Sequence, residues 1–265
     1  MRRTAFSMRI THFAIIVAMS FGVCAQAQNS YKPPPESARI VSRVPFVQAL
    51  PIGGQFQARF NTCDEQDMCL GKPQTCSEDK NHNAALLRLP GGVIFFEAKM
   101  AIDTDGSRLS EKLYEERKKA GNPIVDQPDT SLRYSDGTSL DADTVPYIAV
   151  PGGGFRAQLG FDKGDIVAVV YKDSITYALV GDVGPACKIG EGSLRLHEQL
   201  GDKACLARDN TGVCTRAKNC SIESGVLYFI FPKSRNEIVP GLAPGNINER
   251  IKTLGPELMK RLEKP

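Results

Sequence analysis

Short apolar runs, separated by glycine, proline and polar residues, dominate the central part of the chain. These runs occupy residues 85–89, 92–100, 145–150, 165–171, 174–180 and 225–231. Segments of this length, bounded by turn residues such as Pro90-Gly91, are typical of β-strands. The connection Lys172-Asp173 has the length of a hairpin turn, so the two runs beside it are predicted to pair.

Three polar segments carry apolar residues at helical spacing. Residues 107–121 predict a helix with Ser107 or Ser110 as its N-cap, residues 193–200 predict a short helix capped by Ser193, and residues 247–262 predict a terminal helix. Many short strands with few helices favour a mainly β (α+β) fold. We therefore expect a single compact β-rich domain, barrel-like or a sandwich, with a few peripheral helices and disulfides.

The N-terminus predicts export. Three arginines precede an apolar run at residues 13–23, and Ala25-Gln26-Ala27 follows as a small-residue cleavage site. We interpret residues 1–27 as a bacterial-looking signal peptide, which predicts a secreted protein, extracellular or periplasmic. Residues 28–83 are predicted to form a proline- and cysteine-containing extension, with an extended tether over residues 28–55, and residues 84–265 the main domain.

Charge and cysteine content exclude several classes of protein. Cleavage would leave 30 basic and 30 acidic residues, and no basic cluster indicates a nucleic-acid partner. No later stretch is long and apolar enough to cross a membrane, so we expect no membrane association after cleavage. We also expect a monomer. Seven cysteines would remain, and export favours disulfides among them, with the pairing open. A bridge at Cys187 would restrain the loop around it.

No cofactor or metal site is predicted. The chain lacks the GK[ST], HExxH and GxSxG motifs. The segment from Asp103 to Gly106 resembles the start of a calcium loop, but Tyr114 stands where an EF-hand requires a bidentate glutamate.

Two carboxylates stand out in the glycine-rich stretch 177–193. Asp182 follows an apolar strand and Glu191 lies between Gly190 and Gly192, which we expect to let Glu191 approach a substrate closely. Glycoside hydrolysis needs two carboxyl groups, one protonated to donate to the leaving oxygen and one ionised. The alternative is that these acids only cap turns or a helix start.

Four separated blocks resemble glycoside hydrolase family 75, the fungal-type endo-chitosanases. The blocks are LPGGVIFFEAKMAIDTDG, SLDADTVPYIAVP, VGDVGPACKIGEGS and LYFIFPKSRNEIVPG. The resemblance implies an inverting endo-acting hydrolase of β-1,4 linkages in chitosan or a related amino-sugar polymer. It implies Glu191 as the catalytic acid and Asp182 as the catalytic base.

The same resemblance implies that Asp103, Asp105 and Asp141 bind substrate, because a negative surface suits the ammonium groups of glucosamine. The chain has no tryptophan, so sugar stacking would fall to Tyr134, Tyr147 or Tyr177, although core positions are the commoner use of tyrosine. Two alternatives stay open: a non-catalytic glycan-binding protein, and a hydrolase acting on peptidoglycan.

Overall fold

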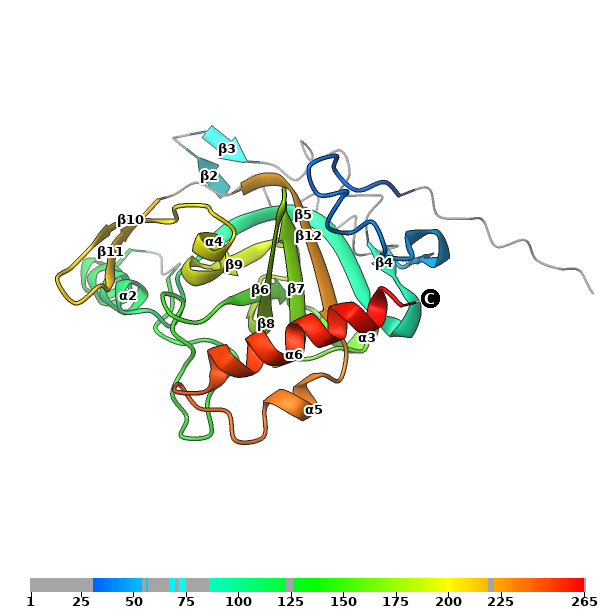
Figure 1. The fold of residues 1–265 in the computed structure, drawn as a ribbon. Coiled ribbons are helices and arrows are strands. Elements are labelled where there is room, and N and C mark those ends of the chain that lie inside the picture. The colour runs from blue at the N-terminus through cyan, green and yellow to red at the C-terminus, as the bar shows by residue number, and fades with distance from the viewer. Residues whose placement is uncertain are drawn as a thin grey trace, which may run out of the picture.

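Six strands pair edge to edge around a closed barrel (Figure 1). In order around the barrel they are β5 (Ile94–Asp103), β12 (Ile222–Phe231), β7 (Ile166–Tyr171), β8 (Ser174–Gly184), β6 (Tyr147–Pro151) and β9 (Glu191–Ser193), which returns to β5. The computed structural model describes residues 31–53, 56, 67–69, 72–74, 86–122, 126–218 and 222–264. The mainly β prediction is confirmed, and the choice left open between barrel and sandwich is settled as a barrel.

Alternation along the strands divides the apolar residues into two clusters. Along β5, Ile94, Phe96, Ala98 and Met100 belong to one cluster, whereas Phe95 belongs to the other. The Phe95 cluster also contains the buried side of helix α6 (Ile247–Leu262), which lies across β7 and β8 (Figure 1). A helix of 16 residues cannot fit inside a six-stranded barrel, so the α6 face is the outer face.

The predicted helices are present, with the predicted caps at two of them. The side chain of Ser107 accepts a hydrogen bond from the Ser110 backbone N–H at the start of α2 (Arg108–Ala120). Ser193 does the same for Leu196 at the start of α4 (Leu194–Gln199). Two short helices were not predicted, α3 (Phe155–Leu159) and α5 (Arg235–Ile238), because segments this short carry little periodic signal.

The N-terminal segment differs from its prediction. The sequence predicts an extended tether over residues 28–55, whereas the described residues 31–53 form turns, the short helix η1 (Phe46–Gln48) and strand β1 (Leu50–Pro51). β1 pairs with β4 (Leu87–Arg88), which continues the sheet from β5. Phe46 packs against Phe95 and Phe229, so this segment covers the outer face of the barrel.

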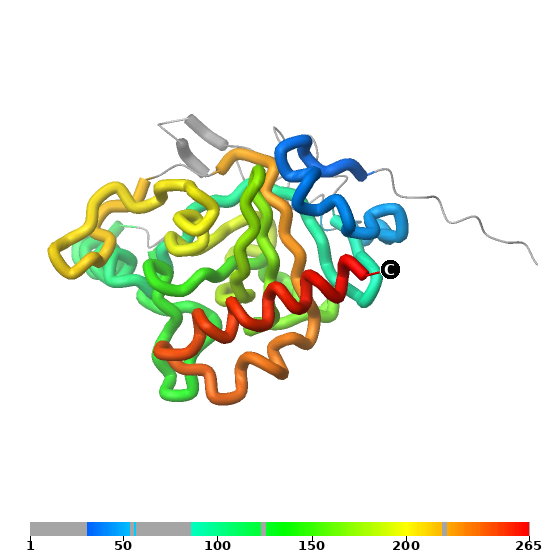
Figure 2. Tube along the Cα trace, viewed as in Figure 1, coloured from blue at the N-terminus to red at the C-terminus, as the bar shows by residue number. Residues whose placement is uncertain are grey.

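The cysteine-rich loop predicted after α4 contains a hairpin of β10 (Cys205–Arg208) and β11 (Cys214–Ala217), closed by a Cys205–Cys214 disulfide. This hairpin lies beside α2 (Figure 2). Arg208 ties it to the barrel through Asp143, 2.7 Å from Nη1 to Oδ1. A second small hairpin pairs β2 (Asp67–Cys69) with β3 (Lys72–Gln74).

Some expectations fall outside what the structure describes. The predicted signal peptide, residues 1–27, and Cys63, Cys76 and Cys220 lie outside the described residues. Within the described residues, no helix combines the length and apolar character that crossing a membrane requires.

Ser193, at the end of β9, connects α4 with the start of β6 and the segment before it. Its buried Oγ accepts from Leu196 N and from Tyr147 N, at 3.2 and 3.1 Å, and donates to Val145 O at 2.8 Å. Replacing Ser193 with alanine should lower the free energy of unfolding by about 2–4 kcal/mol, because buried backbone groups lose their partners. Urea titration of Ser193→Ala measures the loss.

The matched control is Ser107→Ala, which removes the cap of α2 but no contact between strands. It should cost only about 1 kcal/mol. Equal losses in the two variants would show that Ser193 acts as a helix cap alone.

Candidate active site

Asp182 lies inside β8, and a one-residue register shift decides which way it points. In the parallel pair of β6 and β8, Ile148 is opposite Val180 but Ala149 is opposite Asp182, so Gly181 is an extra residue. The shift places Asp182 on the outer face, the face of Tyr147 and Ala149. A Cβ at Gly181 would lie 2.6 Å from the Tyr147 Cβ, so the shift requires glycine there.

Glu191 occupies the same face in the neighbouring strand. It is the first residue of β9, opposite Ala149 of β6 on one side and Ala101 of β5 on the other. One pair further along, Asp103 of β5 is opposite Ser193. Because paired residues point to the same side of a sheet, Asp103, Asp182 and Glu191 all project from the outer face. Sequence positions 103, 182 and 191 are thus brought together by strand pairing.

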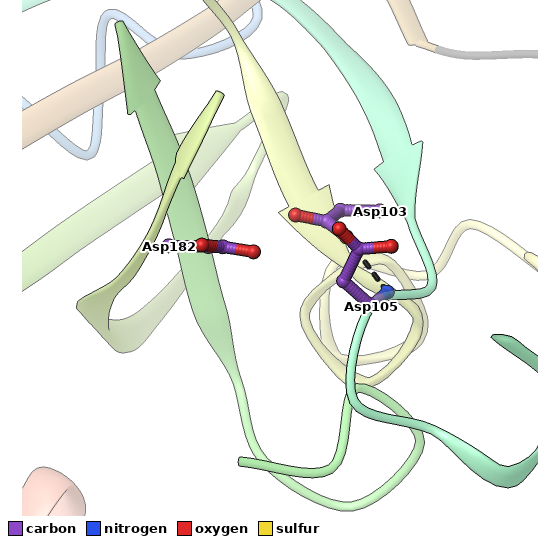
Figure 3. A group of neighbouring side chains, drawn as sticks. All are labelled: Asp103, Asp105 and Asp182. Carbon is purple, nitrogen blue, oxygen red and sulfur yellow. Dashed lines mark hydrogen bonds between the residues drawn. The ribbon is translucent and has the colours of Figure 1, made fainter. Parts of the chain in front are cut away.

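Asp182 is oriented by three hydrogen bonds to one oxygen. Its Oδ1 accepts from the Ser131 backbone N–H at 2.9 Å, from Ser131 Oγ at 2.5 Å and from the Val183 N–H at 2.7 Å. Lys163 Nζ in turn donates to the Ser131 carbonyl at 2.6 Å. The carboxylate is therefore fixed on one side and faces Asp103 and Asp105 with the other (Figure 3).

Asp103 and Asp105 stand at the end of β5, facing Asp182 (Figure 3). One carboxylate oxygen from each of the three residues lies within 4.8 Å of the others. Asp103 Oδ1 accepts from the Asp105 N–H at 2.9 Å and lies 3.2 Å from the Tyr147 hydroxyl. That hydroxyl also donates to the Asp105 carbonyl at 2.8 Å. Tyr147 thus fixes the turn that presents both aspartates.

Burial and like charges favour the protonated forms of these two aspartates. Burial, followed by the negative charges of Asp105, Glu191 and Asp182, raises the pKa of Asp103 well above its ordinary value. Burial raises the pKa of Asp105 to about 7, although the Gln127 N–H bonded to its Oδ1 acts against the rise. The group therefore holds at least one proton near neutral pH.

Glu191 is paired with a lysine. Lys188 Nζ lies 2.6 Å from Glu191 Oε1, and only 10% of the Glu191 side chain is exposed. Lys188 belongs to the turn that follows β8, where its N–H donates to Pro185 O at 3.2 Å. The adjacent Cys187 is disulfide-bonded, as the sequence allowed, so this turn is covalently restrained.

The structure separates the other predicted site residues from this group. Asp141 lies in a turn, where its Oδ1 accepts from the Asp143 N–H at 2.9 Å, and it is not one of the clustered carboxylates. The three tyrosines pack in the protein: Tyr134 and Tyr147 are buried, and Tyr177 lies under Gly255 of α6. Tyr134 and Tyr147 therefore have no open face for stacking on a sugar, whereas Tyr177 is half-buried.

The glycines beside Glu191 have a packing role in addition to the one predicted from the sequence, which stays a prediction. A Cβ on Gly190 would lie 2.2 Å from Lys99 O, and one on Gly192 would lie 2.7 Å from Met100 Sδ. Both glycines let β9 approach β5 closely. They act on the strand that carries Glu191.

Sequence reasoning missed three residues of the site: Ser131, Lys163 and Lys188. Ser131 and Lys163 are far from Asp182 in sequence, and neither lies in a motif that indicates a contact. Lys188 could have been noticed, because it is three residues before Glu191 and carries the opposite charge.

The three aspartates also form the one group of three or more metal-ligating side chains found close together among the described residues. Carboxylate oxygens suit hard cations such as Ca²⁺ or Mg²⁺, which take six or more oxygen ligands. Mg²⁺ often binds through one or two carboxylates and several waters, so three carboxylates are enough protein ligands for such a cation. Protons compete for the same oxygens, because burial raises the pKa of Asp103 and of Asp105.

The raised pKa of Asp105 makes the stability of the protein depend on pH in an unusual direction. Because folding raises its pKa from 3.8 to about 7, the folded state binds more protons between these values and loses stability as the pH rises. Asp105→Asn removes this penalty and keeps an oxygen for the Gln127 N–H. The variant should gain stability relative to the unmutated protein as the pH rises from 4 to 8, measured by calorimetry.

Asp136→Asn is the matched control, because the hydrogen bonds from Thr138 lower the pKa of the exposed Asp136. Its removal should instead cost stability above about pH 4. A difference between Asp105→Asn and the unmutated protein that does not change with pH would contradict the protonation described here.

Comparison with known proteins agrees with this geometry. The sequence profile of a family described as the fungal chitosanase of glycosyl hydrolase group 75 matches residues 100–261, which include Asp103, Asp105, Asp182 and Glu191. No protein in the curated set matches the chain. The matched region covers more than half of the 265 residues and contains five of the six barrel strands entirely. The chain therefore belongs to glycoside hydrolase family 75 and is a chitosanase-like glycoside hydrolase.

Proposed function

We propose that this protein is a secreted, endo-acting hydrolase of β-1,4 linkages in chitosan or a related amino-sugar polymer, and that it inverts the anomeric configuration. Glu191 is the proton donor to the leaving oxygen, and Asp182 is the base that activates water. Family membership supports the substrate class, and the endo action is proposed from the resemblance to the endo-chitosanases. Export is proposed from the arginines and apolar run at the N-terminus.

The position of the two acids in one row is the main geometric support for the proposed mechanism. Asp182 and Glu191 are both opposite Ala149, one from each side, so they are two strand spacings apart in the same row. Two spacings place their Cα atoms about 9–10 Å apart. The Glu191 side chain extends toward β8, because a Cβ on Gly184 would lie 2.8 Å from its Oε2, so the two carboxyl groups are closer together than the Cα atoms.

Inversion is proposed from the resemblance to the endo-chitosanases. Inverting enzymes hold their carboxyl groups about 6.5–9.5 Å apart to leave room for a water molecule, whereas retaining enzymes hold them at about 5–5.5 Å. The Cα separation is compatible with the wider spacing, and the anomer that is released distinguishes the two mechanisms.

The surroundings of Asp182 support its role as base. The three hydrogen bonds to Oδ1 fix the orientation of the carboxylate that would accept a proton from water. They also leave the second oxygen of Asp182 to face the substrate side. Ser131 supplies two of these bonds and is therefore proposed to orient the base.

The neighbouring aspartates support a cationic substrate. One carboxylate oxygen from each of Asp103, Asp105 and Asp182 lies within 4.8 Å of the others, and an ammonium group bound there would replace the protons that this group holds. We propose that they bind the amino group of a glucosamine unit beside the scissile bond. Asp141, in the turn before β6, would contact a more distant unit of the same glycan.

The two catalytic acids give the direct test. Asp182→Asn and Glu191→Gln should each lower kcat on chitosan by about 10²–10⁴-fold, because each removes one proton transfer. Asp136→Asn, an exposed acid outside the group, is the control and should keep full activity. Full activity in either site variant would remove that residue from the mechanism.

Product analysis tests the stereochemistry and the substrate. Proton NMR during early turnover should show the α-anomer from β-linked chitosan, and initial release of the β-anomer would contradict inversion. A parallel digestion of purified peptidoglycan tests the other polymer. If only peptidoglycan gives products, the substrate is peptidoglycan and not chitosan. If the protein binds glycan but neither polymer gives products, it is a non-catalytic binding protein.

A further inference from the structure

Both oxygens of the Glu191 carboxylate are held in the structure. Oε1 lies 2.6 Å from Lys188 Nζ. Oε2 lies so close to Gly184 of β8 that a Cβ there would be 2.8 Å from it. The carboxylate is thus placed between a charge from the 185–190 turn and a side-chain-free position on β8.

The turn that carries Lys188 is fixed at several points. Cys187 is disulfide-bonded, Ile189 is buried, and the Gly190 carbonyl accepts from the Ala101 N–H of β5 at 2.8 Å. About a quarter of the Lys188 side chain is exposed, so the ion pair is partly removed from water. A pair in this setting is stronger than a surface pair, because it is less screened and loses less side-chain entropy on forming.

The other charges around Glu191 are negative. Asp103 at the end of β5, Asp105 in the loop after it and Asp182 on β8 all interact unfavourably with an ionised Glu191 or with its neighbours. Lys188 places a positive charge directly against the Glu191 carboxylate, beside these acids.

We propose that Lys188 is a positioning residue for Glu191: its ammonium fixes the carboxylate in the free enzyme and sets the upper pH limit at which Glu191 can donate a proton. This inference rests on the proposed function, in which Glu191 is the proton donor. Lys188 does not touch the reacting atoms. It acts through the position and the protonation of the carboxylate that does.

Three lysine variants test the electrostatic part. Lys188→Met removes the charge and should shift the alkaline limb of the kcat/KM profile upward by about one pH unit, because the proton on Glu191 is then lost less readily. Lys188→Arg keeps the charge and should leave the limb within about 0.3 unit of its original position. Lys252→Met, on the exposed side of α6, is the control and should change nothing.

The outcomes separate this inference from the proposed function. An unshifted profile in Lys188→Met, with Glu191→Gln inactive, would overturn the role of Lys188 and leave the catalytic acids in place. An upward shift of the acidic limb instead would keep the control by Lys188 but make Glu191 the base. Activity in the Glu191→Gln variant would contradict the proposed function itself.

Gly184→Ala tests the positional part without changing any charge. Its φ lies outside the left-handed region, so alanine fits the backbone, and its methyl group meets only the end of the Glu191 side chain. The variant should lower kcat at least tenfold with KM within about twofold. Gly245→Ala, where a Cβ meets nothing within 4 Å, is the control. Unchanged kcat in Gly184→Ala would contradict the placement of Glu191.

Discussion

The position of Asp182 on the outer face of the barrel depends on the extra residue Gly181 in β8. Without the shift in register at that point, Asp182 would follow the alternation of Ala178 and Val180 and point into the barrel. With it, Asp182 faces outward beside Asp103 and in the same row as Glu191. The close contact between Gly181 and Tyr147 maintains the shift, and the Tyr147 hydroxyl reaches the Asp103–Asp105 turn. One packing contact thus links the position of the base to that of the neighbouring acids.

The face carries more negative charge than folding alone would favour. Asp103 is buried and Asp105 is half-buried beside Asp182, and burial, followed by the neighbouring negative charges, raises the pKa of both. Asp182 is compensated by the donors of Ser131 and Val183, and Glu191 by Lys188. Each of the two proposed catalytic acids therefore has its own partner, which fixes its position in the row.

The sequence predicted the elements of this fold well and their three-dimensional relations poorly. The strands at 92–100, 165–171 and 225–231 and the helix at 247–262 were predicted because their patterns are local. The end of β8 was placed too early, because the glycines around Asp182 resemble a loop while strand pairing extends it to Gly184. β9 has only three residues, and its partners β5 and β6 lie far away in sequence, so no local signal reveals it.

The same distinction applies to the site. Asp103, Asp105, Asp182 and Glu191 were found from their motifs, but the row that relates them required the pairing register. Asp141 shares a motif with buried barrel residues, yet the structure places it in a turn outside the group. Ser131 contacts Asp182, and Lys163 contacts Ser131, through folding alone, which a single sequence does not show.

A crystal structure of the inactive Glu191→Gln variant with a chitosan hexamer bound would test the central claim most directly. The sugar chain should cross the outer face at the ends of β5, β8 and β9. One glycosidic oxygen should lie within about 2.6–3.2 Å of the residue 191 side chain, with a water between the sugar and Asp182 on the opposite side. A hexamer bound away from this row, or a direct contact between Asp182 and the anomeric carbon, would contradict it.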